Sequence, residues 1–463
     1  MKNTAVKTVN TSMLMTVITV TQFLSAFMSA SVNIALPHIA KDFSMSAVES
    51  SWVVMSFLLA TGMFLVPFGK MGDIYGRMRI FVLGNIIFTL SSLFCAISTN
   101  ELMLIASRFS QGIGGAMIMS TGMAIITSAF PPQARGKMLG IAVSAVYLGL
   151  TAAPVLGGIL TQTFGWRSIF MISVGLGIII ILTISLTIKA EWREANQEKF
   201  DTTGSVIYMI AVFLLMTGFS MLPKLPGILM AITGIAGIIA FVLYEIKVEN
   251  PVLNIHLFRK NRVFAFSNFA ALINYAATFA ITFILSLFLQ YVKGLQPSDA
   301  GLLLITQPAV MAATASFAGK LSDKVDPRLL SSLGMGIITI GLVFLCFLDA
   351  GTGNLFLITS LVIVGLGFGT FSSPNTNSVM GSVEKKYLGV AAATISTMRV
   401  LGQIFSMAVA TMVYYMFLGN AKISNTNLIE FSQGSSVIFI IFAILCFFGI
   451  FISLARGGKK TDQ

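Results

Sequence analysis

Charged residues are scarce in this sequence, and their scarcity excludes an ordinary water-soluble fold. Only 10% of the 463 residues are Asp, Glu, Lys or Arg, and 56% are hydrophobic. Soluble domains carry about a quarter charged residues. A chain of this composition has too little polar surface to face water on all sides, so we expect lipid to be the solvent for most of it.

Histidine and cysteine are also rare, which argues against an enzyme or a metal protein. The two histidines, His38 and His256, fall in or near predicted loops, and no nucleophile motif accompanies them. The three cysteines lie inside apolar runs without metal-ligand spacing, and we interpret them as buried apolar side chains (Cys95, Cys346 and Cys446). The sequence predicts no catalytic residue, no metal site and no cofactor.

Long apolar runs make up most of the chain. Each is long enough to cross a hydrocarbon layer of about 30 Å as a helix. Fourteen such helices are expected, at residues 13–36, 50–69, 79–98, 102–129, 138–161, 169–188, 204–222, 226–246, 264–291, 300–319, 330–348, 354–379, 388–417 and 434–455. Two polar linkers divide them into groups of six, two and six. The predicted fold class is an all-α membrane protein.

The basic residues are distributed unequally between alternate loops. With the N-terminus in the cytoplasm, 22 of the 29 Lys and Arg residues fall on the cytoplasmic side, five fall outside, and Arg108 and Arg399 lie within spans. Lys and Arg in short loops favour the cytoplasmic side. We predict a multi-pass protein of the cytoplasmic membrane with both termini in the cytoplasm. The formal charge of +12 is spread over these loops, so nucleic acid is not an expected partner.

A weak internal repeat supports two related halves. The segment GKMGD at 69–73 follows the second span, and GKLSD at 319–323 follows the tenth. Parallel duplication of a six-helix block would produce this spacing. The predicted domains are an N-terminal six-helix bundle (1–190), a linker with two additional transmembrane helices (191–262), and a C-terminal six-helix bundle with a short cytoplasmic tail (263–463). We expect the inserted pair to lie outside both bundles.

The loop between the second and third spans combines glycines with opposite charges. Gly69 and Gly72 allow close helix approach, while Asp73 can cap a helix or pair with Arg77 across the loop, which also contains Gly76. Because the spacing is partly repeated in the other half, we interpret the loop as a conformational latch between moving helices. An ordinary charged turn that only sets topology is the alternative.

Two further groups of residues lie within spans. Arg108 is followed by Gln111 and Gly112, and a guanidinium inside the membrane is costly unless it faces a cavity or a partner. The alternative for Arg108 is a side chain near a helix end that reaches the head groups. The fifth span contains residues that make a kinked, closely packed helix (Gly149, Pro154, Gly157 and Gly158).

These motifs together resemble the major facilitator superfamily, and within it the fourteen-helix drug:proton antiporters, over nearly the whole chain. The loop is similar to the signature loop of that superfamily, Arg108 with Gln111 and Gly112 to its helix-four motif, and the fifth span to its antiporter motif. Arg399 with Gly402 fits the penultimate helix of the family, and residues 200–204 resemble the segment before its inserted helix pair. The resemblance implies two six-helix bundles and export driven by protons.

The first span departs from the family pattern. Met28 stands where the family has Asp, and Ala30 where it has Thr. No Asp or Glu falls near the middle of a predicted span, because Asp42 and Glu49 flank an outer loop and Glu245 ends the eighth span. A buried carboxylate is the usual proton carrier. A proton carrier in this chain would therefore be a peripheral acid or the substrate itself.

We predict a monomeric secondary transporter that exports amphipathic drugs or other small organic solutes by alternating access, with the proton as coupling ion. Amides inside spans, together with Met28, are the candidate cavity-lining groups (Gln22, Met28, Asn33, Asn274, Gln290, Gln307, Asn375 and Asn377). The alternative is a carrier of an anionic metabolite or lipid in which Arg108 and Arg399 face the anion. A channel or a membrane enzyme fits the two-halves plan less well.

Overall fold

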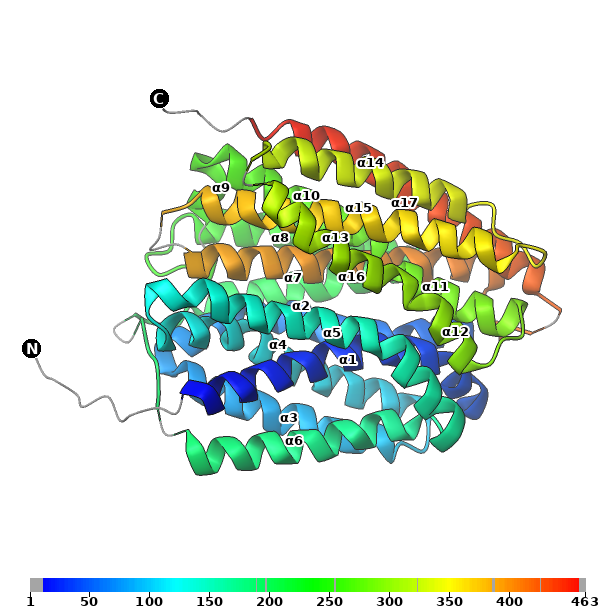
Figure 1. Ribbon diagram of the computed structural model, residues 1–463, viewed down its shortest axis with the longest axis horizontal. Helices are drawn as coiled ribbons and strands as arrows, with labels where there is room; N and C mark the ends of the chain where they lie inside the picture. The colour runs from blue at the N-terminus through cyan, green and yellow to red at the C-terminus, as the bar shows by residue number, and fades with distance from the viewer. Residues whose placement is uncertain are drawn as a thin grey trace, which may run out of the picture.

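Helices account for all the regular structure in the part of the chain described. A computed structural model describes residues 11–457 apart from 189, 196–197, 254, 323, 385–387 and 425. Within that part, 14 helical spans are long and apolar enough to cross a membrane, which confirms the predicted count. The helices lie side by side, and the first described helix begins at the same end of the molecule at which the last one finishes (Figure 1). We call this the terminal end, and the opposite one the far end.

The first six helices pack against one another. They are α1 (Thr11–Phe43), α2 (Ala47–Tyr75), α3 (Arg77–Ala96), α4 (Glu101–Ala129), α5 (Pro132–Phe164) and α6 (Arg167–Thr187). Two of them, α2 and α4, start at polar caps: the amide of Glu49 donates to Ser46 Oγ while the amide of Ser46 donates to the Glu49 carboxylate, and Asn100 caps α4. The main contacts join α1 to α5, α2 to α4, and α3 to both α4 and α6.

The last part of the chain forms a second group of packed helices. They are α10 (Arg262–Thr278), α11 (Ala280–Leu287), the π-helical turn η1 (Phe288–Val292), α12 (Pro297–Leu304), α13 (Thr306–Leu321), α14 (Pro327–Leu345), α15 (Asn354–Gly381), α16 (Leu388–Leu418) and α17 (Leu428–Leu454). A short helix, α9 (Ile255–Lys260), precedes them. The contact of α14 with α15 is the counterpart of that of α3 with α4. The contact of α10 with α16 is the counterpart of that of α1 with α5.

The ninth span runs over Arg262–Val292, as the sequence predicts, but its hydrogen bonding is irregular at one point. That point is Phe279, between α10 and α11, where the backbone angles stay helical. There the amide of Ala280 donates to Ser406 Oγ of α16 at 3.0 Å. We call this local irregularity the break in the ninth span. A hydroxyl from a neighbouring helix supports it, which an apolar pattern cannot reveal.

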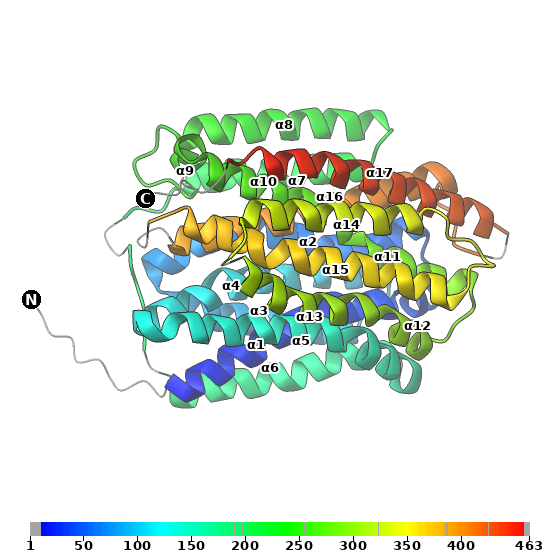
Figure 2. The same ribbon diagram turned by 45° about the horizontal axis from the view of Figure 1, so that its top comes forward.

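The inserted pair consists of α7 (Thr202–Ser220) and α8 (Leu225–Glu245). Figure 2 shows α8 along one edge of the molecule. Its partner α7 packs against α8 and also against α2 and α16, one helix from each group. The Tyr208 hydroxyl donates to the Gly62 carbonyl of α2 at 2.9 Å, and the Phe219 ring lies 5.2 Å from that of Phe405 on α16. Thus α7 contacts both groups, and the placement of the pair outside the two bundles stays a prediction.

Two glycine contacts reveal the internal repeat in three dimensions. Gly84 faces Gly114 between α3 and α4, and Gly334 faces Gly367 between α14 and α15. Gly84 and Gly334 are each the eighth residue of their helix, while Gly114 and Gly367 are each the fourteenth. Close backbone approach at small residues is a main source of helix association in lipid. The same crossing is thus built twice, at the same helical positions.

This packing predicts that Gly114→Ala destabilises the protein. The added methyl group would lie 2.6 Å from the Phe88 nitrogen and 2.7 Å from the Gly84 oxygen, and backbone atoms cannot move aside. Overpacking of this kind costs about 1–3 kcal/mol. Gly140→Ala is the matched control, because a Cβ there meets nothing within 4 Å. Thermal denaturation of the purified variants in detergent should show a lower Tm for Gly114→Ala alone; equal Tm values would refute the close crossing.

Candidate functional site

At the far end, α1 is tied to α11 and η1 by hydrogen bonds to its own backbone. Pro37 has no amide hydrogen, so the Asn33 carbonyl one turn earlier lacks its helical donor. Ser286 Oγ donates to that carbonyl at 2.6 Å, and Gln290 Nε2 donates to the Ile34 carbonyl at 3.0 Å. Pro37 therefore leaves a free acceptor on α1, the Asn33 carbonyl, for a hydrogen bond from the other bundle.

The glycines of the fifth span make the second far-end contact. Gly157 faces Ser31 of α1, whereas Gly158 faces α12, where an added Cβ would lie 2.5 Å from the Pro297 oxygen. In return, a Cβ on Gly301 of α12 would overlap with the carbonyl of Pro154. Gly149 lies against the Phe23 carbonyl of α1. Gly149 and Gly157 therefore pack α5 against α1 of the same group, while Pro154 and Gly158 touch α12 of the other group backbone to backbone. We call the contact of α5 with α12, together with the α1 bonds, the far-end seal.

Below the seal, polar side chains from both bundles meet. Tyr147 Oη of α5 lies 3.3 Å from Ser372 Oγ of α15, and Tyr275 of α10 lies near Ser372 and near Arg399 of α16. The Phe368 ring packs edge-on against Tyr275 at 5.3 Å. We call Tyr147, Tyr275, Ser372 and Arg399 the central polar group. Arg399 was a sequence candidate; the two tyrosines were missed, although a phenol inside an apolar span needs a polar partner.

The predicted amides fall into different surroundings. Asn274 is fully buried next to the break in the ninth span, and neither its oxygen nor its nitrogen has a partner in the described chain. Asn33 and Gln290 belong to the far-end seal, and each keeps one unpartnered side-chain oxygen. Gln22 of α1 is buried against Gly122 of α4. Asn274 is therefore the predicted amide that is most in need of a ligand.

The other candidates on α13 and α15 lie elsewhere. Gln307 is half-buried on α13, and Asn377 donates to Ser322 Oγ at 2.6 Å. Asn375 lies inside the C-terminal bundle, where it donates to the Ser267 carbonyl and accepts from Arg456. Met28, at the family's Asp position, is fully buried in the apolar core.

Arg456 is a buried cation that the sequence analysis counted among the loop residues. Only 1% of its surface is exposed, and its guanidinium donates to Ser267, Asn375 and Ser453. These partners come from α10, α15 and the end of α17. Because Arg456 follows an apolar run in the sequence, its position did not indicate that its side chain is buried between these helices.

Arg108 lies inside the N-terminal bundle. It is 1% exposed, and its Nε donates to the Val53 carbonyl of α2 at 3.0 Å while its Nη1 donates to Gln111. Its guanidinium lies 4.5 Å from the centre of the Phe57 ring, and Gln111 in turn donates to Ser92 of α3. Arg108 therefore joins α4 to α2 and α3 without a carboxylate within ion-pair distance in the described chain.

The latch loop (residues 69–79), predicted as a loop, forms in the structure the last turns of α2 and the first residues of α3, with only Gly76 between the two helices. It binds the linker that follows α6. As predicted, Arg77 pairs with Asp73, at 2.7 Å, but it also pairs with Glu194 of the linker at 2.8 Å. The amides of Glu194 and Ala195 donate to the Asp73 carbonyl. Gly69 packs against Ser120 of α4. The loop is thus closed by a segment that the motif itself does not contain.

Two features of the linker fix this arrangement. Gly76 has a φ of +127°, and a Cβ there would overlap with the carboxylate of Glu191, which accepts from the amides of Met78 and Arg79 at the start of α3. Burial alone would raise the pKa of Glu194, but the Ser128 hydroxyl and the Arg77 guanidinium hold that pKa below its ordinary value. Glu194 is therefore ionised at neutral pH.

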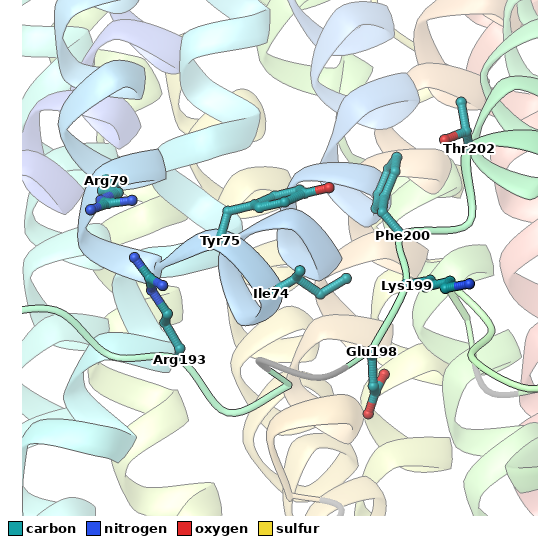
Figure 3. A pocket seen from close by; sticks show the side chains of 8 residues that line it. All are labelled: Ile74, Tyr75, Arg79, Arg193, Glu198, Lys199, Phe200 and Thr202. Carbon is teal, nitrogen blue, oxygen red and sulfur yellow. The ribbon is translucent and has the colours of Figure 1, made fainter.

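A pocket of about 530 Å³ lies beside the latch loop (Figure 3). Arg79 and Arg193 lie on one side, while Lys199, Phe200 and Thr202 line the other. Glu198 lies at its edge and pairs with Lys70 at 2.5 Å. Among the described residues, no group of three His, Cys, Asp or Glu side chains could hold a metal ion.

Comparison with known sequences places the chain among transporters. A family model described as the Major Facilitator Superfamily matches residues 18–407 and, separately, 267–461. The riboflavin transporter RibZ of Clostridioides difficile is 33% identical over 95% of this chain and 96% of its own length. The multidrug resistance protein Stp of Mycobacterium tuberculosis is 29% identical over 82% of this chain and 71% of its own. The multidrug transporter protein MdtP of Bacillus subtilis is 28% identical over 88% of this chain and 76% of its own length.

Comparison with solved structures gives the same fold. A bacterial homolog of the human lysosomal transporter Spinster, in an inward-facing and occupied conformation, matches with a TM-score of 0.70 at 16% identity, over 96% of each chain. The chain therefore belongs to the major facilitator superfamily, in its branch of fourteen-helix, drug-exporter-like transporters.

Proposed function

We propose that this transporter exports amphipathic small organic solutes across the cytoplasmic membrane by alternating access. The observation that carries the proposal is the far-end seal above the central polar group. Two bundles that touch through backbone at one end, with polar side chains from both meeting beneath, form the arrangement that rocking about a central site requires. The names of Stp and MdtP as multidrug proteins support export of varied solutes.

The charge of the loops supports the orientation of this arrangement. We place the terminal end in the cytoplasm, because most Lys and Arg residues lie in the loops of that end. The far-end seal then closes the outer side. In this orientation a solute reaches the central polar group from the cytoplasm and leaves after the seal opens.

The chemistry of the central polar group favours planar solutes that are neutral or negatively charged. It offers one guanidinium, two phenols and a hydroxyl, with Asn274 as a further amide on the same helix as Tyr275. Phenol rings give flat apolar contacts with a polar edge. A permanently cationic drug would find the guanidinium of Arg399 and no carboxylate in this group.

A flavin-type solute is the second candidate, and the relative RibZ favours it. The name of that protein states riboflavin transport, and it matches this chain over nearly its full length. A neutral heteroaromatic ring with a polyol chain suits aromatic faces and amides. An anionic metabolite or lipid remains the alternative solute, and the guanidinium of Arg399 would then face its negative charge.

We propose that transport is coupled to protons, although the outer acids are already engaged. Asp42 accepts from Trp166 Nε1 at 2.8 Å and pairs with Arg167 at 3.2 Å. Glu49 closes the capping box of α2 with Ser46. Neither Asp42 nor Glu49 is therefore free to act as the proton-binding group. The substitution Met28→Asp should add to the first helix the acid that the family has at this position.

The central polar group predicts a selective loss of transport in Arg399→Gln and Tyr147→Phe. Both changes keep most of the side-chain volume and remove the polar contacts, so we expect at least a tenfold lower rate with unchanged Tm. The measurement is uptake of riboflavin or of a neutral fluorescent drug into inside-out vesicles under an imposed pH gradient. Tyr415→Phe is the control, because the Tyr415 ring faces Lys224 near the far end. Wild-type rates in both variants would remove the central site, and uptake only into right-side-out vesicles would reverse the direction.

The latch predicts that Glu194→Gln slows transport by releasing the linker from Arg77. Loss of the ion pair should loosen the linker backbone and so speed trypsin cleavage after Lys199, an exposed linker residue whose own neighbours are unchanged by the substitution. Because the Glu194 pKa is lowered, wild-type docking should persist at neutral pH and be lost only as pH falls below the ordinary Glu value of about 4.3. Glu430→Gln, a substitution of an exposed acid at the start of α17, is the control. Equal cleavage and equal transport in all three proteins would leave the loop as a topology signal only.

A further inference from the structure

Two buried carboxyl groups meet where the inserted helices begin and end. Asp201 caps α7 and Glu245 is the last residue of α8, with 8% and 1% of their surfaces exposed. They face one another across Gly204, where an added Cβ would overlap with Oδ2 of Asp201 and lie 2.5 Å from Oε1 of Glu245. The two carboxyl groups are therefore close neighbours, with Oδ2 of Asp201 and Oε1 of Glu245 on the same side of Gly204.

One oxygen of each carboxyl group is already used. Oδ1 of Asp201 accepts from the Gly204 amide at 2.9 Å and from the Tyr244 hydroxyl at 3.3 Å. Oε2 of Glu245 accepts from the Leu253 amide at 3.1 Å. The remaining oxygens, Oδ2 of Asp201 and Oε1 of Glu245, are buried and have no donor from the described residues.

No cation compensates this pair in the described chain. None of the ion pairs within 4.0 Å involves either carboxylate. Lys199 and Lys247 stand two residues away along the chain, but their side chains are exposed. Among the side chains that the structure describes, the titratable groups that face the pair are its own two members and the Tyr244 phenol. A chloride or phosphate would be repelled here.

Two ionised carboxylates in this position would each present an unpaired acceptor to the other. An ionised carboxylate can only accept hydrogen bonds, and like charges at short range disfavour double ionisation. One proton removes the conflict, because the protonated oxygen donates to its neighbour and both orphan oxygens gain a partner. We propose that Asp201 and Glu245 form a proton-binding pair that holds a single proton between Oδ2 and Oε1.

The position of the pair gives the proton a structural effect. It joins the start of α7 to the end of α8 and to the segment at Leu253. Since α7 packs on α2 and α16, a shift of α7 affects its contacts with both bundles. Loss of the proton leaves two adjacent anions at this junction, and their repulsion weakens the contact of α7 with the end of α8. The pair is thus a protonation site at the terminal end, separate from the central polar group and independent of which solute is carried.

The test is infrared spectroscopy of the purified full-length protein after a pH jump. The wild type should show the C=O stretch of a protonated carboxyl group at neutral pH, and the band should vanish in alkali. Asp201→Asn and Glu245→Gln should each lack this band, because an amide donates to the remaining carboxylate without a shared proton. Asn also preserves the cap of α7. Glu249→Gln, which removes an exposed acid four residues from Glu245, should keep the band.

A second readout covers the case in which a variant changes the fold. The wild type should lose Tm as pH rises from neutral, because ionisation of the pair is then forced, whereas Glu245→Gln should show a smaller loss. A band that persists in both variants, or equal pH dependence of Tm in wild type and Glu245→Gln, would overturn the proposal. Neither readout requires transport, so failure of the proposed export function leaves this test intact.

Discussion

The contact of backbone with backbone across the far end is the constraint on which the rest of the structure depends. In lipid, apolar side chains gain little by leaving one apolar surface for another, so close packing and hydrogen bonds must hold the bundles. The chain provides both by removing atoms: Pro37 removes an amide hydrogen, while Gly158 and Gly301 remove side chains. Such a contact can open as a unit, because no long side chain has to be withdrawn from a pocket.

Buried arginines show the other solution to the same problem, which is rigidity within a bundle. Arg108 and Arg456 are nearly inaccessible, and their donors end on carbonyls, amides and hydroxyls of neighbouring helices. A guanidinium with fixed neutral acceptors ties several helices together. Arg399 differs because it is only half-buried and faces a tyrosine from its own bundle beside one from the other. The three arginines thus separate into two structural ties and one candidate ligand contact.

The amino-acid sequence predicts the fold well because lipid makes the pattern simple. Span count, the Asp73–Arg77 pair and the closely packed fifth helix follow from apolar length, spacing and small residues. Contacts that depend on distant segments were not predictable. Nothing local in 191–195 indicates that Glu194 binds Arg77, and nothing local at Phe279 indicates that Ser406 supports a break. Asn375 illustrates the same limit, since its partner Arg456 lies past the final span.

The far-end seal and the terminal end should move in opposite directions if the bundles rock as rigid bodies. Spin labels on exposed residues of the two bundles, Leu102 with Leu355 at the far end and Leu186 with Phe317 at the terminal end, report the two separations. Gly301→Leu forces a side chain against the Pro154 carbonyl and so pushes the seal apart. The account predicts that this variant lengthens the far-end distance and shortens the terminal-end distance together, as measured by pulsed electron resonance. A longer far-end distance with an unchanged terminal-end distance would mean local distortion, and would contradict alternating access by rocking of the two bundles.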